Sequence, residues 1–497
     1  MAPENSPKTQ SPEAYDQVPY PSRPTALSHP SAIAALGRVF RLQPPPPSQC
    51  RVLEIGCASG GNLIPMAQDY PDSQFVGFDL SGQQIARGQR MVDALRLTNL
   101  CLFQANILEL DNRLGDFDYI ICHGVYSWVP SDVQAAILRT GRERLSDNGL
   151  MYVSYNTYPG WRMRGVVREM MQYHVAKFAS PRDQIDQARN LLAFLGRSAD
   201  HQSESFGTLL KEEAKLLSRV DDSYLFHEHL EANNTPLYFH EFANRVASSG
   251  LGYVGDANLE TMVTDDFDES TRATLIDASF LEQEQYMDFL RGRMFRRSLL
   301  CHLDAPLNRQ IDVRCLVGMH LRIVEAMSHC EDAETGETKF VGESKRLSTN
   351  SDVAKCLIQV LVDAFPNWKV TDHLVAEIVE FSSGSVTPDW CLRELTRLIC
   401  RGFVVPRLEP PSFVTKISNC PMTTPLVRWQ VQQKQPFVSS RLHESVSVRD
   451  DDRHLLSKLD GDATIEHLRK EAAAASHSND WLDERLAYFA YHSLLVG

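Results

Sequence analysis

Three features that would place the protein in a special class are missing from its sequence. No run of about 18 apolar residues occurs, so no membrane-spanning helix is expected. Residues 1–24 are polar and proline-rich and lack the apolar core of a secretion signal, so we expect a cytoplasmic protein. The 11 cysteines include no Cys-x-x-Cys pair. Their odd number and wide spacing predict reduced thiols, neither a zinc site nor a disulfide scaffold.

Basic residues are also scarce. Lys and Arg total 50 against 64 Asp and Glu, a formal net charge of −14. A chain this acidic is a poor general binder of polyanions, so no nucleic-acid partner is expected. The length of 497 residues and the 43% hydrophobic content predict about three folded domains and exclude bulk disorder.

Strand and helix patterns alternate through the first third of the chain. Near-continuous apolar strands are predicted at 51–56, 74–79, 100–105, 117–122 and 149–156, with helices at 62–70, 82–97 and 131–146. This alternation predicts an α/β fold with a doubly wound, Rossmann-like parallel sheet. After Trp161 the pattern is helical, at 161–179 and 182–220. We therefore expect a helical insertion near 180–238 before the sheet resumes. Residues 239–256 predict a helix leading into a strand, and 295–303 a further strand.

The rest of the chain carries weaker signals. Residues 310–350 show no clear pattern, 352–408 resemble a winged-helix unit, 409–450 are loop-like, and helices are expected at 452–475 and 480–495. Six basic against seven acidic residues over 352–408 favour protein contact or scaffolding over DNA reading. The predicted domains are 1–45 (extended segment and lid helix), 46–179 (Rossmann-like), 180–308 (helical and regulatory), 309–410 (winged-helix-like) and 411–497 (C-terminal).

The strongest chemical signal is the turn Val52-Leu53-Glu54-Ile55-Gly56-Cys57-Ala58-Ser59-Gly60-Gly61-Asn62. A strand runs into small residues and a helix follows, so backbone N–H groups can approach a ligand closely. Asp79 ends the next strand, where a carboxylate can accept hydrogen bonds from both hydroxyls of a ribose. Glu54 would repel a pyrophosphate but attract an ammonium group. The pattern therefore favours S-adenosylmethionine (SAM) over NAD.

Two further stretches support a SAM site. Asn106 and Ile107 follow the third strand, where an amide and an apolar flank can grip an adenine ring. His123 lies in Cys122-His123-Gly124-Val125-Tyr126-Ser127-Trp128 after the fourth strand, on the side where the methyl acceptor must lie. Alanine at position 58 costs little in place of glycine if its φ is negative.

Several stretches, in order, resemble class I SAM-dependent methyltransferases that carry a methyltransferase regulatory domain, in particular the rickettsial protein lysine methyltransferases. They are Tyr15-Asp16-x-Val18-Pro19-Tyr20-Pro21-Ser22, LEIGCASGGNLIPMA, HGVYSWVP, SYNTYPGWR, YLFHEHLEANNTPLYFHEFANRVASSGLGYV and FRRSLLCH. The resemblance implies that Glu54, Gly56, Ala58, Gly60 and Asn62 hold the methionine part, Asp79 and Leu80 the ribose, and Asn106 and Ile107 the adenine, with His123 beside the cofactor. It also implies an envelope or surface protein as substrate and a homodimer.

Methylation of a lysine requires an acceptor without its proton, and a desolvated aromatic pocket lowers the pKa of an amine. The chain supplies Tyr126, Trp128, Tyr155, Tyr158 and Trp161 near strand ends, and Tyr20 as a lid residue. The stretch after the fourth strand lacks Asn/Asp-Pro-Pro-Tyr, which disfavours methylation of amides and of base amines. Three hypotheses remain open: a protein lysine methyltransferase, a small-molecule methyltransferase with regulatory or dimerisation domains, and a non-catalytic SAM-binding interaction protein.

Overall fold

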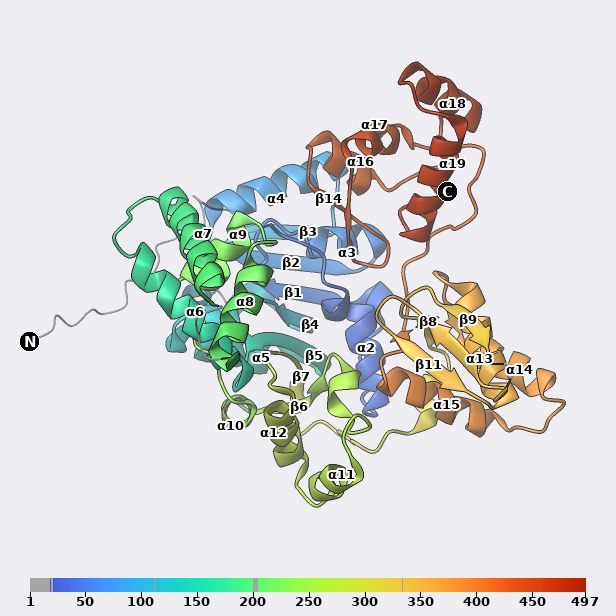
Figure 1. The fold of residues 1–497 in the computed structure, drawn as a ribbon, viewed down its shortest axis with the longest axis horizontal. Coiled ribbons are helices and arrows are strands. Elements are labelled where there is room, and N and C mark those ends of the chain that lie inside the picture. Colours follow the sequence, from blue (N-terminus) through green and yellow to red (C-terminus); the bar gives the residue numbers. More distant parts are fainter. Residues whose placement is uncertain (1–17, 19–20, 111, 200–203, 333) are drawn as a thin grey trace, which may run out of the picture.

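A seven-stranded sheet forms the centre of the computed structural model, which describes residues 18, 21–110, 112–199, 204–332 and 334–497 (Figure 1). The strand order is β3-β2-β1-β4-β5-β7-β6. The strands are β1 Arg51–Ile55, β2 Gln74–Asp79, β3 Leu100–Gln104, β4 Phe117–Cys122, β5 Leu145–Asn156, β6 Leu251–Asp256 and β7 Phe295–His302. Strands β1 to β5 are parallel, and β7 runs antiparallel to both its neighbours. The predicted doubly wound sheet is confirmed.

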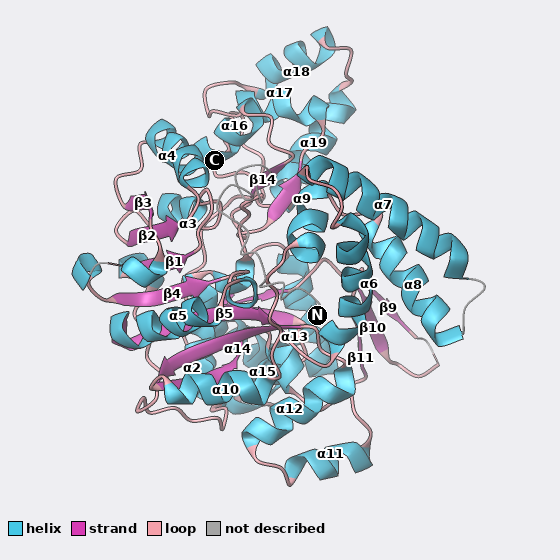
Figure 2. Ribbon diagram, turned by 90° about the vertical axis from the view of Figure 1, so that its left-hand side faces the viewer, coloured by secondary structure: helices cyan, strands magenta, loops and turns pink. Residues whose placement is uncertain are grey.

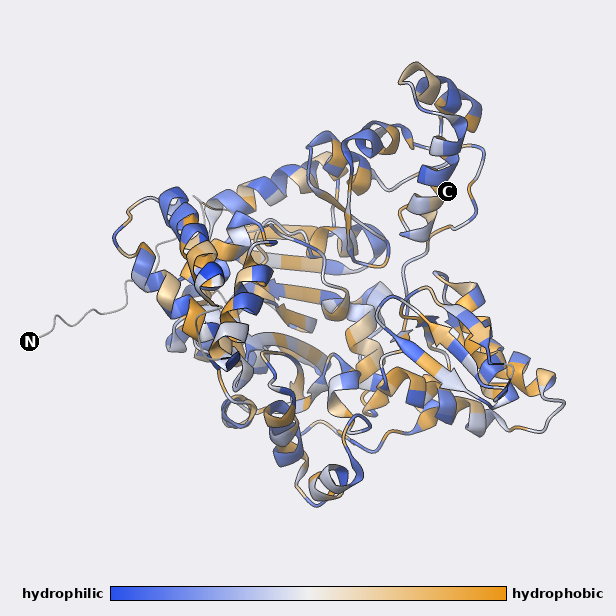
Figure 3. Ribbon diagram, viewed as in Figure 1, coloured by the Kyte–Doolittle hydropathy of each residue, from blue (hydrophilic) through white to orange (hydrophobic). Residues whose placement is uncertain are grey.

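Helices cover both faces of the sheet, which is why its strands are apolar on both sides (Figure 3). Helices α2 Pro30–Val39, α3 Leu63–Asp69 and α4 Gly82–Leu95 pack on one face, and α5 Ser131–Arg144 and α10 Phe239–Ser248 pack on the other. Short helical turns are η1 Ala26–Ser28, η2 Pro47–Gln49, η3 Ile107–Glu109, η4 Asn112–Leu114, η5 Tyr126–Trp128, η8 Leu259–Met262 and η9 Val313–Leu316. The active edge of such a sheet lies at the carboxyl ends of β1 to β5.

A helical insertion follows β5, as predicted, and has its own apolar cluster (Figure 2). It contains α6 Gly160–Val175, α7 Pro181–Ser198, α8 Glu204–Leu217, α9 Asp222–Leu225 and the π-turn η7 Phe226–Leu230. The stretch expected to be helical over 182–220 forms two helices, α7 and α8, packed against each other. Each helix is amphipathic in its own right, so helical periodicity alone did not reveal where the chain turns between them.

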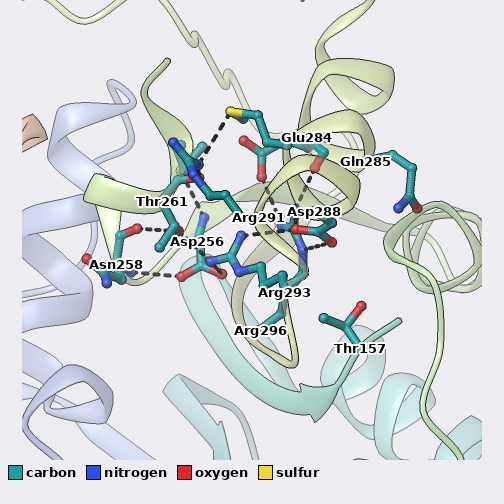
Figure 4. A network of polar contacts seen from close by, with 12 residues as sticks. Thr157, Asp256, Asn258, Thr261, Glu284, Gln285, Asp288, Arg291, Arg293 and Arg296 are labelled. Atoms are coloured by element: carbon teal, nitrogen blue, oxygen red, sulfur yellow. Dashed lines mark hydrogen bonds and ion pairs between the residues drawn. The ribbon is translucent and has the colours of Figure 1, made fainter. Parts of the chain in front are cut away.

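A buried ionic network closes the antiparallel edge of the sheet (Figure 4). Arg296 on β7 is fully buried and pairs with Glu284 and Asp288 of α12 Phe280–Arg291, each at 2.8 Å. Arg293 bridges Asp288 to Asp256 at the end of β6, at 3.4 and 2.9 Å. The network fixes α12 to the sheet, and α11 Glu269–Ile276 precedes α12 in the chain.

The middle region contains two small sheets and three helices. Its elements are β8 His320–Ile323, β9 Ser328–Glu331, β10 Thr338–Val341, β11 Arg346–Thr349, α13 Asp352–Ala364, β12 Lys369–Val370, α14 Thr371–Phe381, α15 Pro388–Cys400 and β13 Val404–Arg407. The sheets are ordered β11-β10-β9 and β12-β8-β13. All four side chains of β9 are exposed, so this strand has no apolar alternation to detect.

The C-terminal region has a separate apolar core. It consists of α16 Pro425–Gln432, the hairpin β14 Phe437–Ser439 and β15 Ser445–Ser447, and helices α17 Asp450–Lys458, α18 Ile465–Ala474 and α19 Asn479–Tyr491. The helix expected over 452–475 is broken at Gly461, whose φ of 93° excludes a continuous helix. Helix α16 and the hairpin lie in the stretch that the sequence indicated as loop.

Two further expectations concern single residue types and segments. Each of the 11 cysteines is a free thiol in the structure, and their reduced state in the cell stays a prediction. In the described part of the chain, no helix has both the length and the apolar character needed to cross a bilayer.

Candidate active site

The turn after β1 has the backbone shape that the glycines predicted. Gly56 and Gly60 have φ values of 71° and 74°, a region that side chains rarely enter. A Cβ on Gly56 would lie 2.5 Å from Cγ2 of Val125, in the segment after β4. The turn therefore packs closely against the fourth strand end and directs its backbone toward the active edge of the sheet.

Ala58 does not have the negative φ at which alanine would replace glycine at little cost. Its φ is 47°, not negative, so an alanine occupies the left-handed region. This conformation costs on the order of 1 kcal/mol relative to glycine. Its N–H donates to Asp79 Oδ2 at 2.8 Å, and this contact helps to hold the strained turn.

Glu54 is a buried carboxylate at the end of β1, only 4% exposed. Asn62 Nδ2 donates to its Oε1 at 2.8 Å. Its Oε2 is buried and has no hydrogen-bond partner among the described residues. Burial raises the pKa of Glu54 from 4.5 to about 8. The hydrogen bond from Asn62 acts in the opposite direction, and the nearby charge of Asp79 raises the pKa further. An unpaired buried carboxylate oxygen is a ready partner for an ammonium group.

Asp79 joins the cofactor turn to the next strand end. Its Oδ2 accepts from Ala58 N at 2.8 Å, and its Oδ1 accepts from Ser81 N at 2.9 Å. Leu80, beside it, is 50% exposed. The carboxylate is thus held at the carboxyl end of β2, where a ribose would lie in this type of sheet.

The adenine-side residues lie on the neighbouring strand. Strand β3 pairs with β2 so that Gln104 lies opposite Asp79, which brings Asn106 and Ile107 to the same edge. Asn106 Oδ1 accepts from Leu108 N at 3.1 Å and so begins η3, while Ile107 is buried. The structure therefore brings together all the predicted cofactor residues on β1, β2 and β3.

His123 follows β4 and lies half-buried beside this edge. Its Nδ1 lies 3.1 Å from the Tyr152 hydroxyl and 3.2 Å from Ser154 Oγ, both on β5. Burial lowers the pKa of His123 from 6.5 to about 4, and the charge of Arg297 lowers it further. The imidazole is therefore neutral at physiological pH.

The other predicted acceptor-side aromatics divide into two groups. Tyr126 and Tyr155 are fully buried, and both contact Phe242 of α10, with the Tyr155 ring stacked at 4.0 Å. Trp128 instead meets Trp161 edge-to-face at 6.1 Å, and both belong to segments at the active edge. Alternation along β5 puts Tyr155 on the face that α10 covers. Tyr20 lies outside the described residues.

A cavity of about 170 Å³ opens between α6 and the segment that follows η7. It is lined by Tyr158, Trp161, Arg162, Gly165, Val166, Arg168, Glu169, Asn234 and Pro236. Asn234 is tied to the end of β5, because Asn156 Nδ2 donates to its Oδ1 at 3.2 Å. Sequence reasoning identified Tyr158 and Trp161 but missed Asn234, which only the fold of the insertion brings to them.

The N-terminal segment lies directly on the cofactor turn. Gly61 N donates to Ser22 Oγ at 2.7 Å, and Thr25 N donates to Asn62 Oδ1 at 3.0 Å. A Cβ on Gly61 would lie 2.3 Å from the Ser22 carbonyl oxygen. Ser22 and Thr25 were not predicted as site residues, although one of the stretches that carry the resemblance ends at Ser22.

Three family models match the chain. They describe a methyltransferase domain at 53–151, a predicted methyltransferase regulatory domain at 221–302, and a PKMT C-terminal winged helix domain at 419–492. The last lies after the middle region 309–410, where sequence reasoning placed a winged-helix-like unit.

Relatives match over nearly the whole length. An uncharacterized protein of Rickettsia prowazekii is 33% identical over 95% of this chain and 89% of its own. The solved structure of PKMT2 from Rickettsia typhi is 30% identical, covers 96% of this chain and 100% of its own, and superposes with a TM-score of 0.85.

The chain belongs to the rickettsial-type protein lysine methyltransferase (PKMT) family.

PKMT2 from Rickettsia typhi is also known in complex with AdoHcy, with the same TM-score of 0.85 to this chain. This PKMT family member is a SAM-dependent methyltransferase with a Rossmann-like sheet and C-terminal winged-helix domain. The residues present fit the cofactor: Glu54 offers an unpartnered oxygen, Asp79 a carboxylate at the ribose position, and Gly56 a turn that admits close backbone approach. These findings disfavour the hypothesis of a non-catalytic SAM-binding protein.

Proposed function

We propose that this methyltransferase transfers the methyl group of SAM to a lysine amine of a protein substrate. The observation that carries the proposal is similarity to PKMT2 that extends through the C-terminal region as well as the sheet. A small-molecule methyltransferase would need only the sheet and its insertion. The middle region 309–410 and the C-terminal region 411–497 then provide surface for a large substrate, and a homodimer belongs to the same proposal.

The proposal assigns the cofactor to the residues at the ends of β1 to β3. Glu54 and Asn62 would bind the amino-acid end, with Gly56, Ala58 and Gly60 in the turn below it. Asp79 and Leu80 would bind the ribose, and Asn106 and Ile107 the adenine. When bound, SAM supplies a methyl group on a positively charged sulfur. The protein must align that methyl group with the acceptor nitrogen and exclude water.

The acceptor side is assigned to the cavity beside α6. Tyr158 and Trp161 line it, and Trp128 packs edge-to-face against Trp161. Aromatic faces lower the pKa of a buried amine by desolvation and stabilise the methylammonium product by cation–π contact. His123 is neutral, with a pKa of about 4. It is therefore a weak proton acceptor, and we assign it to orienting groups at the strand end and not to general base catalysis.

Tyr126 and Tyr155 enter the proposal as supports of the wall. Their rings fill the space between β5 and α10, so they hold the strand end in place and do not reach the cavity themselves. Substitution of either tyrosine by phenylalanine should therefore change stability more than the apparent affinity for acceptor.

The experiment incubates purified protein with SAM carrying a labelled methyl group and with bacterial extract that includes envelope proteins. Label on lysine side chains of protein bands, located by mass spectrometry, is the expected result. Label confined to the small-molecule fraction would favour a small-molecule acceptor instead. The Asp79→Ala variant is the matched control and should bind S-adenosylhomocysteine at least about 100-fold more weakly, because it removes a charged hydrogen-bond acceptor.

A further inference from the structure

The C-terminal region reaches the cofactor turn through one side chain, His443. This residue lies at the tip of the hairpin β14–β15, between Ser439 and Ser445. It is buried, 3% exposed, and its Nε2 lies 2.7 Å from Asn62 Oδ1. The two residues are 381 positions apart in the sequence.

The hydrogen-bond pattern determines which nitrogen of His443 carries the proton. Asn62 Oδ1 is an acceptor, since Thr25 N also donates to it at 3.0 Å. His443 Nε2 must therefore be the donor. Burial, helped by the charge of Arg407, lowers the pKa of His443 from 6.5 to about 3, so the ring is a neutral Nε2–H donor across the physiological range.

His443 acts together with Thr25 N and Ser28 Oγ to orient the amide of Asn62. With two N–H groups on Oδ1, the Nδ2 group points the other way, where it donates to Glu54 Oε1 at 2.8 Å and to Ser28 Oγ at 3.1 Å. That contact occupies one oxygen of Glu54 and leaves the other, Oε2, without a partner. The chain of contacts thus runs from the hairpin tip through Asn62 to the carboxylate that we assign to the ammonium end of the cofactor.

The hairpin is held over the cofactor domain by contacts that do not involve the turn itself. Arg441 forms an ion pair with Asp69 at the end of α3, and both side chains are almost buried. Leu426 N donates to Gln68 Oε1 at 3.2 Å. The His443 backbone has a φ of 62°, a strained conformation for a residue other than glycine. Such strain persists where the surroundings determine the conformation, and it is common at functional sites.

We propose that His443 is a positioning residue for the cofactor, through which the C-terminal domain orients Asn62 and Glu54. The inference rests on the proposed cofactor site. It assigns the C-terminal region a role in SAM binding, in addition to any role in binding substrate.

Two substitutions separate the hydrogen bond from the backbone. In His443→Gln the amide nitrogen can occupy the place of Nε2, because the side chains have the same reach. In His443→Asn the amide is one bond shorter and cannot reach Asn62, but asparagine tolerates positive φ better than glutamine. If His443 has a purely structural role, the asparagine variant should be the more stable of the two. If His443 positions the ligand, the glutamine variant should bind the ligand more tightly than the asparagine variant.

Titration calorimetry with S-adenosylhomocysteine on the full chain is the test. We expect His443→Asn to weaken binding about fivefold to tenfold, the loss of one neutral hydrogen bond, and His443→Gln to stay within about twofold. His29→Asn is the neighbouring control. The His29 ring lies 5.0 Å from that of His443, but its Nδ1 accepts from Ser31 N, which asparagine can replace, so affinity should not change.

Each other outcome contradicts the proposal in a distinct way. Unchanged affinity in both His443 variants shows that the contact does not position the ligand. Equal weakening in both shows that ring packing matters and the donor does not. Unchanged affinity in Asp79→Ala as well would show that the assignment of the cofactor site itself is wrong. Circular dichroism and thermal melting without ligand confirm that each variant is folded.

Discussion

At the scale of single residues, the site depends on one buried carboxylate. Glu54 accepts a hydrogen bond from Asn62 on one oxygen, and its other oxygen has no partner in the described part of the chain. In the absence of ligand, burial raises its pKa to about 8, so the side chain is protonated at neutral pH. A ligand ammonium would favour the charged form and displace this proton. Ionised Glu54 therefore lowers the stability of the ligand-free protein, but it can bind the ammonium group of a ligand.

Replacing Glu54 with Gln should stabilise the ligand-free protein and weaken ligand binding. The folded-state pKa is higher than the unfolded value, so the unfolded chain ionises first, and wild-type stability falls as pH rises from about 4.5 to about 8. The variant lacks this fall. In urea unfolding, the free energy of unfolding of the variant should exceed that of wild type by about 1–3 kcal/mol at pH 8, and the two should differ little at pH 4. Calorimetry should show weaker binding of S-adenosylhomocysteine.

The exposed Glu466→Gln serves as the control, since the Glu466 side chain is 80% exposed and should leave the pH profile unchanged. A Glu54→Gln profile parallel to that of wild type between pH 4 and 8 would contradict the raised pKa of Glu54.

At the scale of elements, two segments distant in sequence fix the ends of the sheet. The N-terminal segment covers the cofactor turn through Ser22 and Thr25. The regulatory region closes the other edge through the network of Arg293 and Arg296 with the acids of β6 and α12 (Figure 4). The contact of the N-terminal segment depends on a close approach of two backbone segments. The contact of the regulatory region depends on paired buried charges.

Gly61→Ala should displace the N-terminal segment from the turn. The new Cβ would lie 2.3 Å from the Ser22 carbonyl oxygen, so the segment must move. We expect several-fold weaker binding of S-adenosylhomocysteine and faster proteolytic cleavage near residue 22. In the control Gly165→Ala, the new Cβ meets nothing within 4 Å, and alanine should stabilise α6 by up to about 1 kcal/mol. Unchanged cleavage in Gly61→Ala would show that the segment does not need this contact.

Arg296→Leu should strongly destabilise the fold. It would leave Glu284 buried without the cation it pairs with, and Asp288 with only the longer contact to Arg293 at 3.4 Å. The loss of one partner from a buried pair costs about 3–5 kcal/mol. Urea unfolding measures this difference. The control Arg397→Met removes a pair whose Arg side chain is 68% exposed, and it should cost less than about 1 kcal/mol. Similar losses in the two variants would contradict the importance of the buried network.

At the scale of the whole molecule, the first and last parts of the chain meet at the cofactor turn. Ser22 and Thr25 approach it from the N-terminus, and His443 approaches it from the C-terminal domain. Binding at the turn should therefore stabilise elements that a cofactor bound to an isolated sheet would not reach.

Amide hydrogen exchange can measure this coupling. S-adenosylhomocysteine should slow exchange in the hairpin 437–447 as well as in the turn, and leave the distant helix α18 unchanged. In His443→Asn the protection of the hairpin should fall while that of the turn persists. Ligand protection confined to the sheet in the wild-type protein would show that the C-terminal domain is not coupled to the site.

The sequence by itself determined the sheet and the positions of the cofactor residues. Apolar runs, helical periodicity and the glycine turn are local patterns, and parallel strands bring their carboxyl ends to one edge by rule. Glu54, Asp79, Asn106 and His123 could therefore be placed before the fold was known. Local patterns failed where strands are short and exposed, as in β9, and where two amphipathic helices follow each other, as in α7 and α8.

Only the tertiary structure decided which side chains meet across the domains. The burial of Tyr126 and Tyr155 depends on α10, the cavity at Trp161 depends on the fold of the insertion, and the contact of His443 with Asn62 spans 381 residues. The physical reason is that these contacts arise from the packing of separate elements, which no local periodicity or propensity encodes.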